Sequence, residues 1–417
     1  MTSDPAVAAA ARLEARLLPH VDAPVAVALS GGGDSVALLH LAAAWAERRG
    51  RRLVAVTVDH RLHPDSAAWT AEAGRAARAL GVAWTRQVWT DDKPAAGLAA
   101  AARRARHALL AEAARAAGAR VILTGHTLDD RREAAWLRAQ GGTLGRMRDW
   151  NPSPVWPEGR GLMLLRPLIN LARADLRAWL AVRGIGWFDD PANVDPTHPR
   201  ARARAAIAAG AMVEAEPLPP ESMPATGVAA LPAGALRLPR DIDARTLAAA
   251  VVCAGGGETM PRGHRAGDLA SRVAEPRRDM VATLSGARII ARDDRILVVR
   301  EAGEWARGGA PVSPLPPGQA IVWDGRFEVT AATPGWCVVP ARGRLGRLPP
   351  EDRRKLAGWP AALRPAAPLL ALEAGVAPRL AVAAVTVRDL VRVRFAMATG
   401  ETPHERDLGP PQDGAGA

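Results

Sequence analysis

The sequence is poor in several residue types: it contains no tyrosine, three phenylalanines and two cysteines. The cysteines, Cys253 and Cys337, are too few and too far apart for a disulfide framework or a zinc cluster, and no Cys-x-x-Cys pair occurs. No apolar run reaches the roughly 20 residues that a membrane span requires. The N-terminus lacks a basic segment followed by an apolar stretch, which argues against a secretory signal. We therefore expect a cytoplasmic protein with reduced thiols and no membrane contact.

Acidic residues are too few to balance the basic ones. The chain has 55 Lys and Arg against 43 Asp and Glu, which gives a net charge of +12. Lysine occurs only at Lys93 and Lys355, so almost all of the positive charge is arginine. A GC-rich genome would explain arginine in place of lysine, but it does not explain the excess of positive charge. A basic surface favours a phosphate-rich partner, although charge alone leaves a nucleic acid and an ordinary basic surface as equal alternatives.

Strand and helix patterns alternate between about residues 24 and 122. Short apolar strands are predicted at 25–29, 53–58, 82–88 and 120–124, with helices at 36–47, 67–80 and 98–117. This alternation predicts an α/β fold with a doubly wound parallel sheet. Ligands of such sheets bind at the carboxyl ends of the strands. Three polar segments fall at those ends, namely 30–35, 59–60 and 125–130.

The rest of the chain reads as smaller domains joined by Pro-rich segments. We predict a catalytic domain at 1–212, a linker at 213–227, an α+β domain that binds RNA at 228–307, a mostly β domain at 316–402 and a disordered tail at 403–417. Within the first domain, the Pro-rich segment 151–161 is interpreted as an excursion or lid loop. A helix is expected within 166–184, and a β-hairpin within 280–302.

The segment SGGGDS, residues 30–35, lies between a predicted strand and a predicted helix. Its glycines allow positive φ and close approach of a ligand to the backbone. Consecutive N–H groups followed by the positive end of a helix form a binding site for phosphate. A carboxylate repels phosphate, so Asp34 is predicted to bind Mg²⁺, which would bridge to the phosphate oxygens. The spacing matches neither G-x-x-x-x-G-K-[ST] nor G-x-G-x-x-G, and a Gly-rich turn without ligand is the alternative.

SGGGDS after a strand resembles the signature of the PP-loop ATP pyrophosphatases, which adenylate an oxygen and release pyrophosphate. Further segments resemble one family within that group, the tRNA(Ile)-lysidine synthetases. VDHRLHPDS (58–66) is similar to V-D-H-x-L-R-P-x-S, AARRARHALL (101–110) to A-R-E-A-R-Y, and GHTLDDRREA (125–134) to H-H-x-D-D-Q-x-E-T. RPLINLARADLRAWL (166–180) resembles R-P-L-L-x-x-x-R, and 189–204 resembles D-P-S-N…R-N-R-I-R. The segment 282–302 also resembles the family's C-terminal region.

The resemblance implies a reaction and its partners. The O2 atom of the wobble cytidine of tRNA(Ile) with a CAU anticodon would attack the α-phosphate of ATP, and free lysine would then displace AMP. ATP and Mg²⁺ are the implied cofactors, with Asp34 as metal ligand. The expected ATP-binding residues are Ser30, Gly31, Gly32, Gly33, Asp34, Ser35, Asp59, His60 and His126. The expected catalytic residues are Asp34, Arg103, Asp130 and Glu133. The expected substrate-binding residues are Arg106, Asp129, Arg200, Arg202 and Arg204.

Each of these assignments has a structural alternative. Arg103 and Arg106 are three residues apart on a predicted helix, where they could clamp phosphate or form a solvated basic face. Asp130 and Glu133 have the same spacing and could bind the lysine ammonium and accept its proton, or form a surface carboxylate pair. The basic run of Arg200, Arg202 and Arg204 could follow the tRNA backbone or simply face water. His126 could contact ATP or the base, or be a structural histidine.

The sequence departs from the family patterns at several positions. The departures include His107, Thr127, Arg131, Ala134, Gln140 and Ala192. They motivate one rival hypothesis, a tRNA-binding protein with a decayed ATP site. A second rival, a tRNA thiolase, needs a cysteine in the first half of the chain, where there is none. A third, an amidotransferase-type synthetase acting on a free nucleotide, lacks a glutaminase-like Cys/His arrangement. The oligomeric state stays open, a homodimer included.

Overall fold

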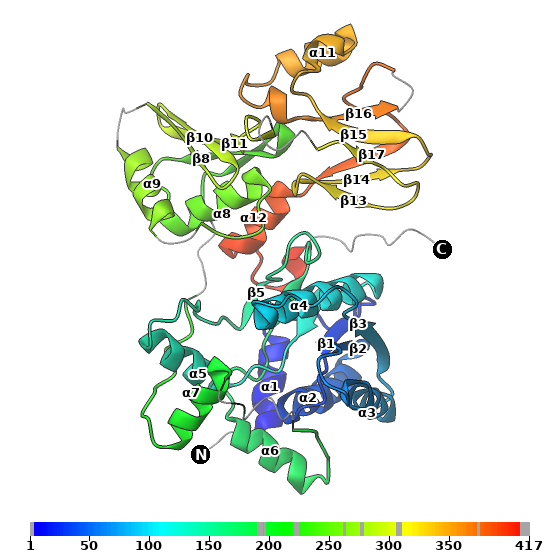
Figure 1. Ribbon diagram of the computed structural model, residues 1–417, viewed down its shortest axis with the longest axis vertical. Helices are drawn as coiled ribbons and strands as arrows, with labels where there is room; N and C mark the ends of the chain where they lie inside the picture. The colour runs from blue at the N-terminus through cyan, green and yellow to red at the C-terminus, as the bar shows by residue number, and fades with distance from the viewer. Residues whose placement is uncertain are drawn as a thin grey trace. The chain divides into compact units, whose positions relative to one another are not determined.

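The computed structural model describes residues 4–189, 195, 197–220, 225–261, 264–275, 279–305, 311–372 and 376–408. The chain forms two compact units (Figure 1). The first runs from the N-terminus to Glu221 and resumes at Thr402, and the second is Ser222–Glu401. The chain therefore crosses between the units twice, and its C-terminal segment belongs to the same unit as its N-terminus.

The first unit is built on a six-stranded sheet with the order β3-β2-β1-β4-β6-β5. The first five of these strands run parallel, and β5 is an antiparallel edge strand. The central strands consist of small and branched apolar residues, as expected where helices cover both faces of a sheet. The predicted strands at 25–29, 53–58, 82–88 and 120–124 are confirmed. The strands are β1 Val25–Ala28, β2 Leu53–Asp59, β3 Ala83–Val88, β4 Val121–Leu123, β5 Trp150–Pro152 and β6 Met163–Leu165.

Helices cover both faces of this sheet. Figure 1 shows α4 on one side of β1, β2 and β3, and α2 and α3 on the other. On the α4 side, Leu110 and Ala114 belong to a buried cluster with Val54 and Ile122. The predicted doubly wound α/β fold is thus confirmed. No helix in the described part of the chain is long and apolar enough to cross a bilayer. The helices are α1 Pro5–Glu14, α2 Gly33–Arg49, α3 Ser66–Ala79, α4 Leu98–Ala116, α5 Leu128–Ala139, α6 Arg173–Val182 and α7 Pro199–Ala208.

The interpretation of 151–161 as an excursion or lid loop was wrong. Its first residues belong to the edge strand β5, which pairs with β6. Val155 and Trp156 are buried, and Val155 joins the core under α4. Proline is tolerated on an edge strand because one row of N–H groups there has no partner in the sheet. The Pro-rich composition therefore led to a loop being predicted for residues that belong to the core.

The second unit contains a five-stranded sheet, two three-stranded sheets and the helices α8, α9, α11 and α12. The expected hairpin within 280–302 is present as the antiparallel strands β9, β10 and β11. The predicted division into an α+β and a mostly β domain cuts through one core, because Val391 and Phe395 of α12 pack with Leu247 of α8. The elements are β7 Ala229–Leu231, β8 Ala235–Pro239, α8 Ala244–Gly255, α9 Arg265–Ala274, β9 Met280–Leu284, β10 Ala287–Arg292, β11 Arg295–Arg300, β12 Ser313–Pro314, β13 Ile321–Trp323, β14 Phe327–Ala331, β15 Trp336–Pro340, α11 Pro350–Ala357, β16 Pro368–Leu372, β17 Val385–Asp389 and α12 Val391–Thr399.

The tail and the linker also differ from the predictions. Residues 405–408 form a turn of 3₁₀-helix instead of disordered chain. The Glu405 carboxylate is buried and receives hydrogen bonds from Arg51 Nη1 at 2.8 Å and Nη2 at 2.9 Å. A single acidic residue in a polar tail gives no signal of this pairing. In the predicted linker, Glu216 accepts a hydrogen bond of 3.0 Å from Arg138 of α5, so this part is docked on the first unit. Residues 221–224 and 409–417 lie outside the described residues.

Candidate active site

The phosphate loop connects β1 to α2, as the sequence predicts. Ser35 donates a hydrogen bond from Oγ to the Gly32 carbonyl at 2.9 Å and accepts one from the Ser30 N–H at 3.2 Å. Gly31 has a φ of +87°, which other residues rarely adopt. The first N–H groups of α2 have no partners within the helix, and they carry the positive end of its dipole. The loop is therefore closed on itself and presents backbone donors to an anion.

Two other segments are in close contact with this loop. A Cβ on Gly33 would lie 3.3 Å from the Trp187 ring, and one on Gly125 would lie 3.1 Å from the backbone of Asp34. Phe188 donates its N–H to the Gly31 carbonyl at 3.0 Å. The end of β4 and the segment after α6 thus reach the loop directly. Close packing of backbone on backbone explains why glycine occupies these positions.

Three predicted carboxylates meet around one arginine that the sequence analysis did not assign. Arg173, the first residue of α6, lies 2.9 Å from Asp34 Oδ2, 3.2 Å from Glu133 Oε1 and 3.6 Å from Asp130 Oδ2. Its own N–H donates to Asp129 Oδ2 at 2.7 Å. Arg173 is the last arginine of the R-P-L-L-x-x-x-R pattern, so the motif contained the signal. Its partners come from other elements, and the motif alone could not identify them.

The pKa values of Asp34 and Arg173 are both raised in this cluster, for different reasons. Burial raises the pKa of Asp34, and Arg173 offsets only part of that effect. Burial would lower the pKa of Arg173, but Asp34 and Asp130 outweigh it and raise that pKa. Asp34 Oδ1 and Glu133 Oε2 are buried and have no hydrogen-bond donor among the described residues. Arg200 Nη1 lies 3.9 Å from Glu133 Oε2, too far for a hydrogen bond. A buried carboxylate oxygen without a hydrogen bond is costly, so these two atoms mark places for a ligand.

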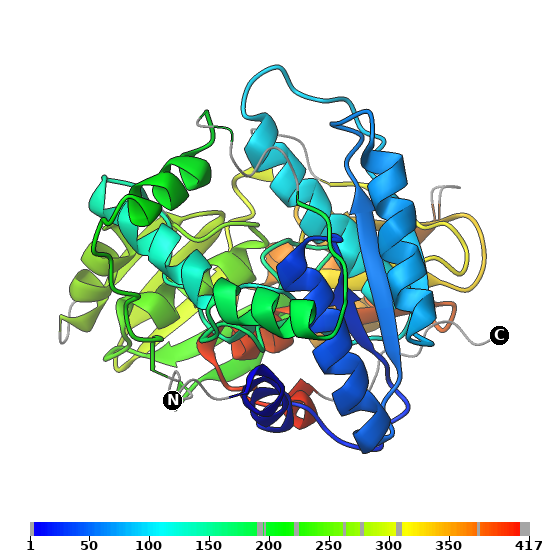
Figure 2. The same cartoon turned by 90° about the horizontal axis from the view of Figure 1, so that it is seen from below.

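The basic run 198–206 forms the helix α7, which changes the meaning of its spacing. Arg200 and Arg204 lie one turn apart and face α5, with Arg200 Nη1 3.0 Å from Asp130 Oδ1 and Arg204 Nε 2.7 Å from Glu133 Oε1. Arg202 instead donates to the Thr197 carbonyl at 3.0 Å. Figures 1 and 2 both show α5 and α7 side by side. Two of the three arginines therefore contact the predicted lysine-binding carboxylates.

A second group of cations lies around Arg103 and Arg106 of α4. Burial lowers the pKa of Arg106 to about 10, and the charges of Arg103 and Arg200 add to that effect. Burial together with Arg166 and other cations likewise lowers the pKa of His126 to about 3, so this imidazole is neutral. Within the described ranges, neither Arg103 nor Arg106 makes a hydrogen bond or ion pair. Crowded cations that no ion pair neutralises form a site for phosphate.

Asp59 and His60, both predicted to bind ATP, differ in their surroundings. Asp59 accepts hydrogen bonds from the Arg61 N–H at 2.9 Å and from Arg86 Nη2 at 2.5 Å, which together outweigh burial and lower its pKa. Asp59 thus holds the turn that follows β2. His60 packs edge-on against Trp89, and burial lowers its pKa to about 4. Its Nδ1 atom is buried with no partner in the described chain, so it remains available to a ligand.

The departures from the family patterns at the start of α5 have structural explanations. Thr127 donates to Asp130 Oδ2 from its N–H at 2.8 Å and from Oγ1 at 3.0 Å, which caps the helix and fixes Asp130. Arg131 bonds Asn170 Oδ1 at 2.7 Å. Ala134 is buried. Ala192 lies outside the described residues. These substitutions leave the carboxylate cluster assembled.

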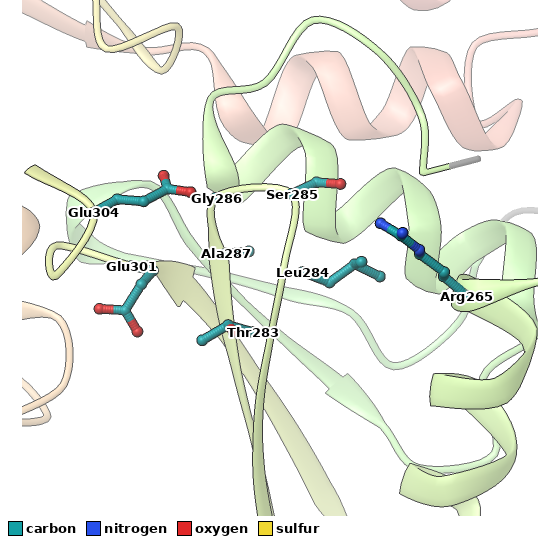
Figure 3. Close-up of a pocket in the computed structure, with 8 residues that line it drawn as sticks. All are labelled: Arg265, Thr283, Leu284, Ser285, Gly286, Ala287, Glu301 and Glu304. Atoms are coloured by element: carbon teal, nitrogen blue, oxygen red, sulfur yellow. The ribbon is translucent and has the colours of Figure 1, made fainter. Parts of the chain in front are cut away.

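A separate hollow of about 350 Å³ lies in the second unit (Figure 3). The tight turn at Ser285 and Gly286 forms one side, and Arg265, Glu301 and Glu304 border it. Glu301 accepts the Gly303 N–H at 2.7 Å, and Glu304 accepts from Arg300 at 2.5 Å. The two carboxylates that border the hollow are therefore already paired with neighbouring residues. It contains none of the predicted site residues, and we assign the chemistry to the first unit.

Comparisons with known proteins agree with this assignment. The family described as a PP-loop domain matches residues 5–210. A tRNA(Ile)-lysidine synthase of Caulobacter vibrioides is 50% identical over 400 residues, covering 94% of this chain and 96% of that protein. One from Hyphomonas neptunium is 37% identical, covering 75% and 88%. A solved structure, the U34-tRNA thiolase NcsA from Methanococcus maripaludis, aligns with a TM-score of 0.38 and 15% identity, covering 50% of this chain and 80% of that one.

Proposed function

Because this chain belongs to the tRNA(Ile)-lysidine synthase family, we propose that it joins lysine to C2 of the wobble cytidine of tRNA(Ile) with a CAU anticodon. ATP first adenylates the cytidine O2 with loss of pyrophosphate. The lysine ε-amine then forms the C–N bond, and AMP leaves with that oxygen. The observation that supports this most is the meeting of the phosphate loop with the carboxylates of α5 at Arg173. Nucleotide and amine would thereby react at one place.

The phosphate loop provides the nucleotide half of the site. The backbone donors between Gly31 and Ser35 would hold the pyrophosphate of ATP. The unpartnered Asp34 Oδ1 suits Mg²⁺, which commonly takes one or two carboxylates and completes its shell with phosphate and water. When bound, Mg²⁺ would neutralise charge on the departing pyrophosphate.

Arg103 and Arg106 provide positive charge for the same step. Their guanidinium groups repel each other and make no ion pair in the described chain, and the charge of Asp130 offsets that repulsion only in part, so a phosphate between them would relieve it. Charge grows on the leaving group as the P–O bond breaks, and fixed cations stabilise that charge. His126 stays neutral beside them and can donate or accept one hydrogen bond.

The α5 carboxylates provide the lysine half of the site. Asp130 and Glu133 are paired with Arg200 and Arg204, so the cluster offers both charge signs that free lysine requires. The ε-ammonium must lose a proton before its nitrogen can attack. Glu133 Oε2 has no hydrogen-bond donor among the described residues and is the atom we assign to accept it.

The remaining predictions concern the partners. The second unit is proposed to bind the tRNA, in keeping with the net charge of +12. Arg202, which donates to the Thr197 carbonyl at 3.0 Å, stays a candidate for contact with the tRNA backbone. The homodimer, the cytoplasmic location and the disposition of the tRNA on the protein stay predictions.

The test is incorporation of radiolabelled lysine into tRNA(Ile) by the purified protein with MgATP. A tRNA(Met) control tests the choice of RNA. Asp34→Ala removes the proposed metal ligand, and Asp22→Ala is the matched control, because Asp22 is an exposed aspartate of the same unit. We expect label in tRNA(Ile) alone, lost in Asp34→Ala and retained in Asp22→Ala.

Two other outcomes would contradict the proposal in different ways. ATP turnover with RNA but without lysine incorporation would retain the adenylation chemistry and reject lysine as the nucleophile. Absence of both turnover and label would favour a tRNA-binding protein without catalysis.

A further inference from the structure

Three aromatic rings form a continuous stack in the first unit. His63 follows β2, Trp69 belongs to α3, and Phe188 follows α6. The ring centroids of His63 and Trp69 are 4.4 Å apart with planes at 22°, and those of Trp69 and Phe188 are 4.2 Å apart at 27°. Phe, Trp and Tyr together make up 4% of the chain, so a face-to-face stack assembled from three separate segments is not a consequence of aromatic abundance.

The stack begins at the phosphate loop. Phe188 donates its N–H to the Gly31 carbonyl at 3.0 Å and forms a bridge with Gly32. The carbonyl oxygen of Trp69 lies 3.9 Å from where a Cβ on Gly31 would stand. From this contact the rings continue to His63. The stack therefore connects the proposed nucleotide site to an exposed point on the same unit.

The last ring is held in place while remaining accessible. His63 Nδ1 accepts the Asp65 N–H at 3.2 Å, and the His63 side chain is 43% exposed. Trp69 and Phe188 are half-buried and absent from the core clusters of buried residues. A ring fixed by one edge and backed by a second ring loses little conformational freedom when another flat group binds to it.

We propose that His63 is a stacking platform for an unpaired base of the RNA substrate, and that it positions the anticodon loop while the target cytidine enters the site. RNA loops are commonly recognised by stacking of splayed bases on aromatic side chains. The identity of this RNA rests on the proposed function, but the stacking does not.

An RNA base is favoured over the adenine of ATP. His63 is the outermost ring, and two other rings separate it from the loop that would hold the ATP phosphates. Stacking on an exposed platform needs no enclosing pocket and tolerates any base. A neighbouring base of the anticodon loop meets these conditions, since it must be held without being chemically altered.

Two substitutions at the same position separate the ring from its hydrogen bond. His63→Asn keeps an acceptor for the Asp65 N–H and removes the ring. His63→Phe keeps the ring and removes the acceptor. The full-length proteins would be compared for binding of a fluorescein-labelled anticodon stem–loop with a CAU anticodon, followed by fluorescence anisotropy. The KM for ATP would be measured in parallel.

We expect His63→Asn to weaken RNA binding at least about fivefold, and His63→Phe to stay within about twofold of the wild type. The KM for ATP should be unchanged in both. Equal loss in both variants, or loss in His63→Phe alone, would overturn the proposal and assign His63 to holding its turn. A raised KM for ATP in His63→Asn would overturn it in favour of an adenine platform. RNA binding unchanged in His63→Asn would also overturn it.

Binding is measured without catalysis, so the two proposals can fail separately. If the wild type binds the stem–loop but incorporates no lysine into tRNA(Ile), the proposed function fails. The comparison of the two His63 variants then still decides whether a base stacks on the ring.

Discussion

Each unit of the molecule contains a cluster of arginines around aspartate, and the two clusters differ in how completely they are satisfied. In the second unit, Asp324 accepts hydrogen bonds from Arg300, Trp305 and Arg326, at 2.7 to 3.3 Å. Arg326 uses its other nitrogens on two backbone carbonyls, at 2.6 and 3.0 Å. In the first unit, Arg173 joins three carboxylates, yet Asp34 Oδ1 and Glu133 Oε2 receive no hydrogen bond from the described residues, and Arg200 Nη1 lies 3.9 Å from Glu133 Oε2.

The comparison shows how a structural cluster can be told from a functional one. A buried charge network stabilises a fold only when each member is satisfied. The Asp324 cluster meets that condition, and Arg326 joins it to the backbone carbonyls of Ala233 and Ala366. The Arg173 cluster leaves two oxygens for a ligand and lies beside backbone donors. The same residue types therefore serve stability in one unit and binding in the other.

The strongest test exchanges aspartate for asparagine at the Arg173 cluster. Asp34→Asn keeps the shape of the side chain but removes the charge that would bind Mg²⁺. We expect lysine incorporation to fall about a thousandfold, since one lost electrostatic contact to a transition state is commonly worth that much. The melting temperature should change little. A large drop in melting temperature with activity retained would show that this cluster stabilises the fold, like the Asp324 cluster, and does not serve catalysis.

The same exchange at the other cluster should have the opposite effect. Asp324→Asn leaves Arg300 and Arg326 buried beside a neutral group, so we expect the protein to lose about 3 kcal/mol of stability. The measurement is urea denaturation followed by tryptophan fluorescence, because Trp305 and Trp323 lie near this cluster. ATP-dependent pyrophosphate release should persist under conditions where the variant is folded. Unchanged stability would mean that the network contributes nothing.

A third test concerns the cations that lack partners. Arg106→Gln should raise the KM for ATP roughly 10- to 100-fold, the usual value of a hydrogen bond to a charged group. The variant should also fold normally, because no described residue depends on that guanidinium group. Arg104→Gln, on the exposed side of the same helix, is the matched control. An equal effect of both substitutions would point to a diffuse basic surface.

The smallest expected effect comes from a buried histidine next to these cations. Burial, with Arg106 and Arg103, lowers the pKa of His107 to about 2. A pKa below the unfolded value of about 6.5 means that the unfolded chain binds the proton first, so stability is full above that pH and falls as the pH drops below it. His107→Phe should remove up to about 1.4 kcal/mol per pH unit of that loss. Urea denaturation at pH 7.5 and 5.5 measures it, and identical pH dependence in both proteins would contradict it.

Local patterns allowed the first four strands, the phosphate loop and the family to be predicted from the sequence. The alternation of apolar strands and amphipathic helices needs no long-range information, because period and composition are local properties. The segment 151–161 was misread because its prolines are tolerated on an edge strand, and nothing local reveals which strand is at an edge. The tail was misread because the partner of Glu405 is Arg51, at the other end of the chain.

What the sequence by itself determined is the chemistry available: a loop of glycines that can hold phosphate, and carboxylates and arginines in order along the chain. Only the tertiary structure decided which of them act together. It placed Arg173 between Asp34 and Glu133, and it directed Arg200 toward Asp130 instead of toward solvent. The physical reason is that ion pairs and ring stacks form across distances set by the packing of the helices on the sheet. No spacing along the chain encodes those distances.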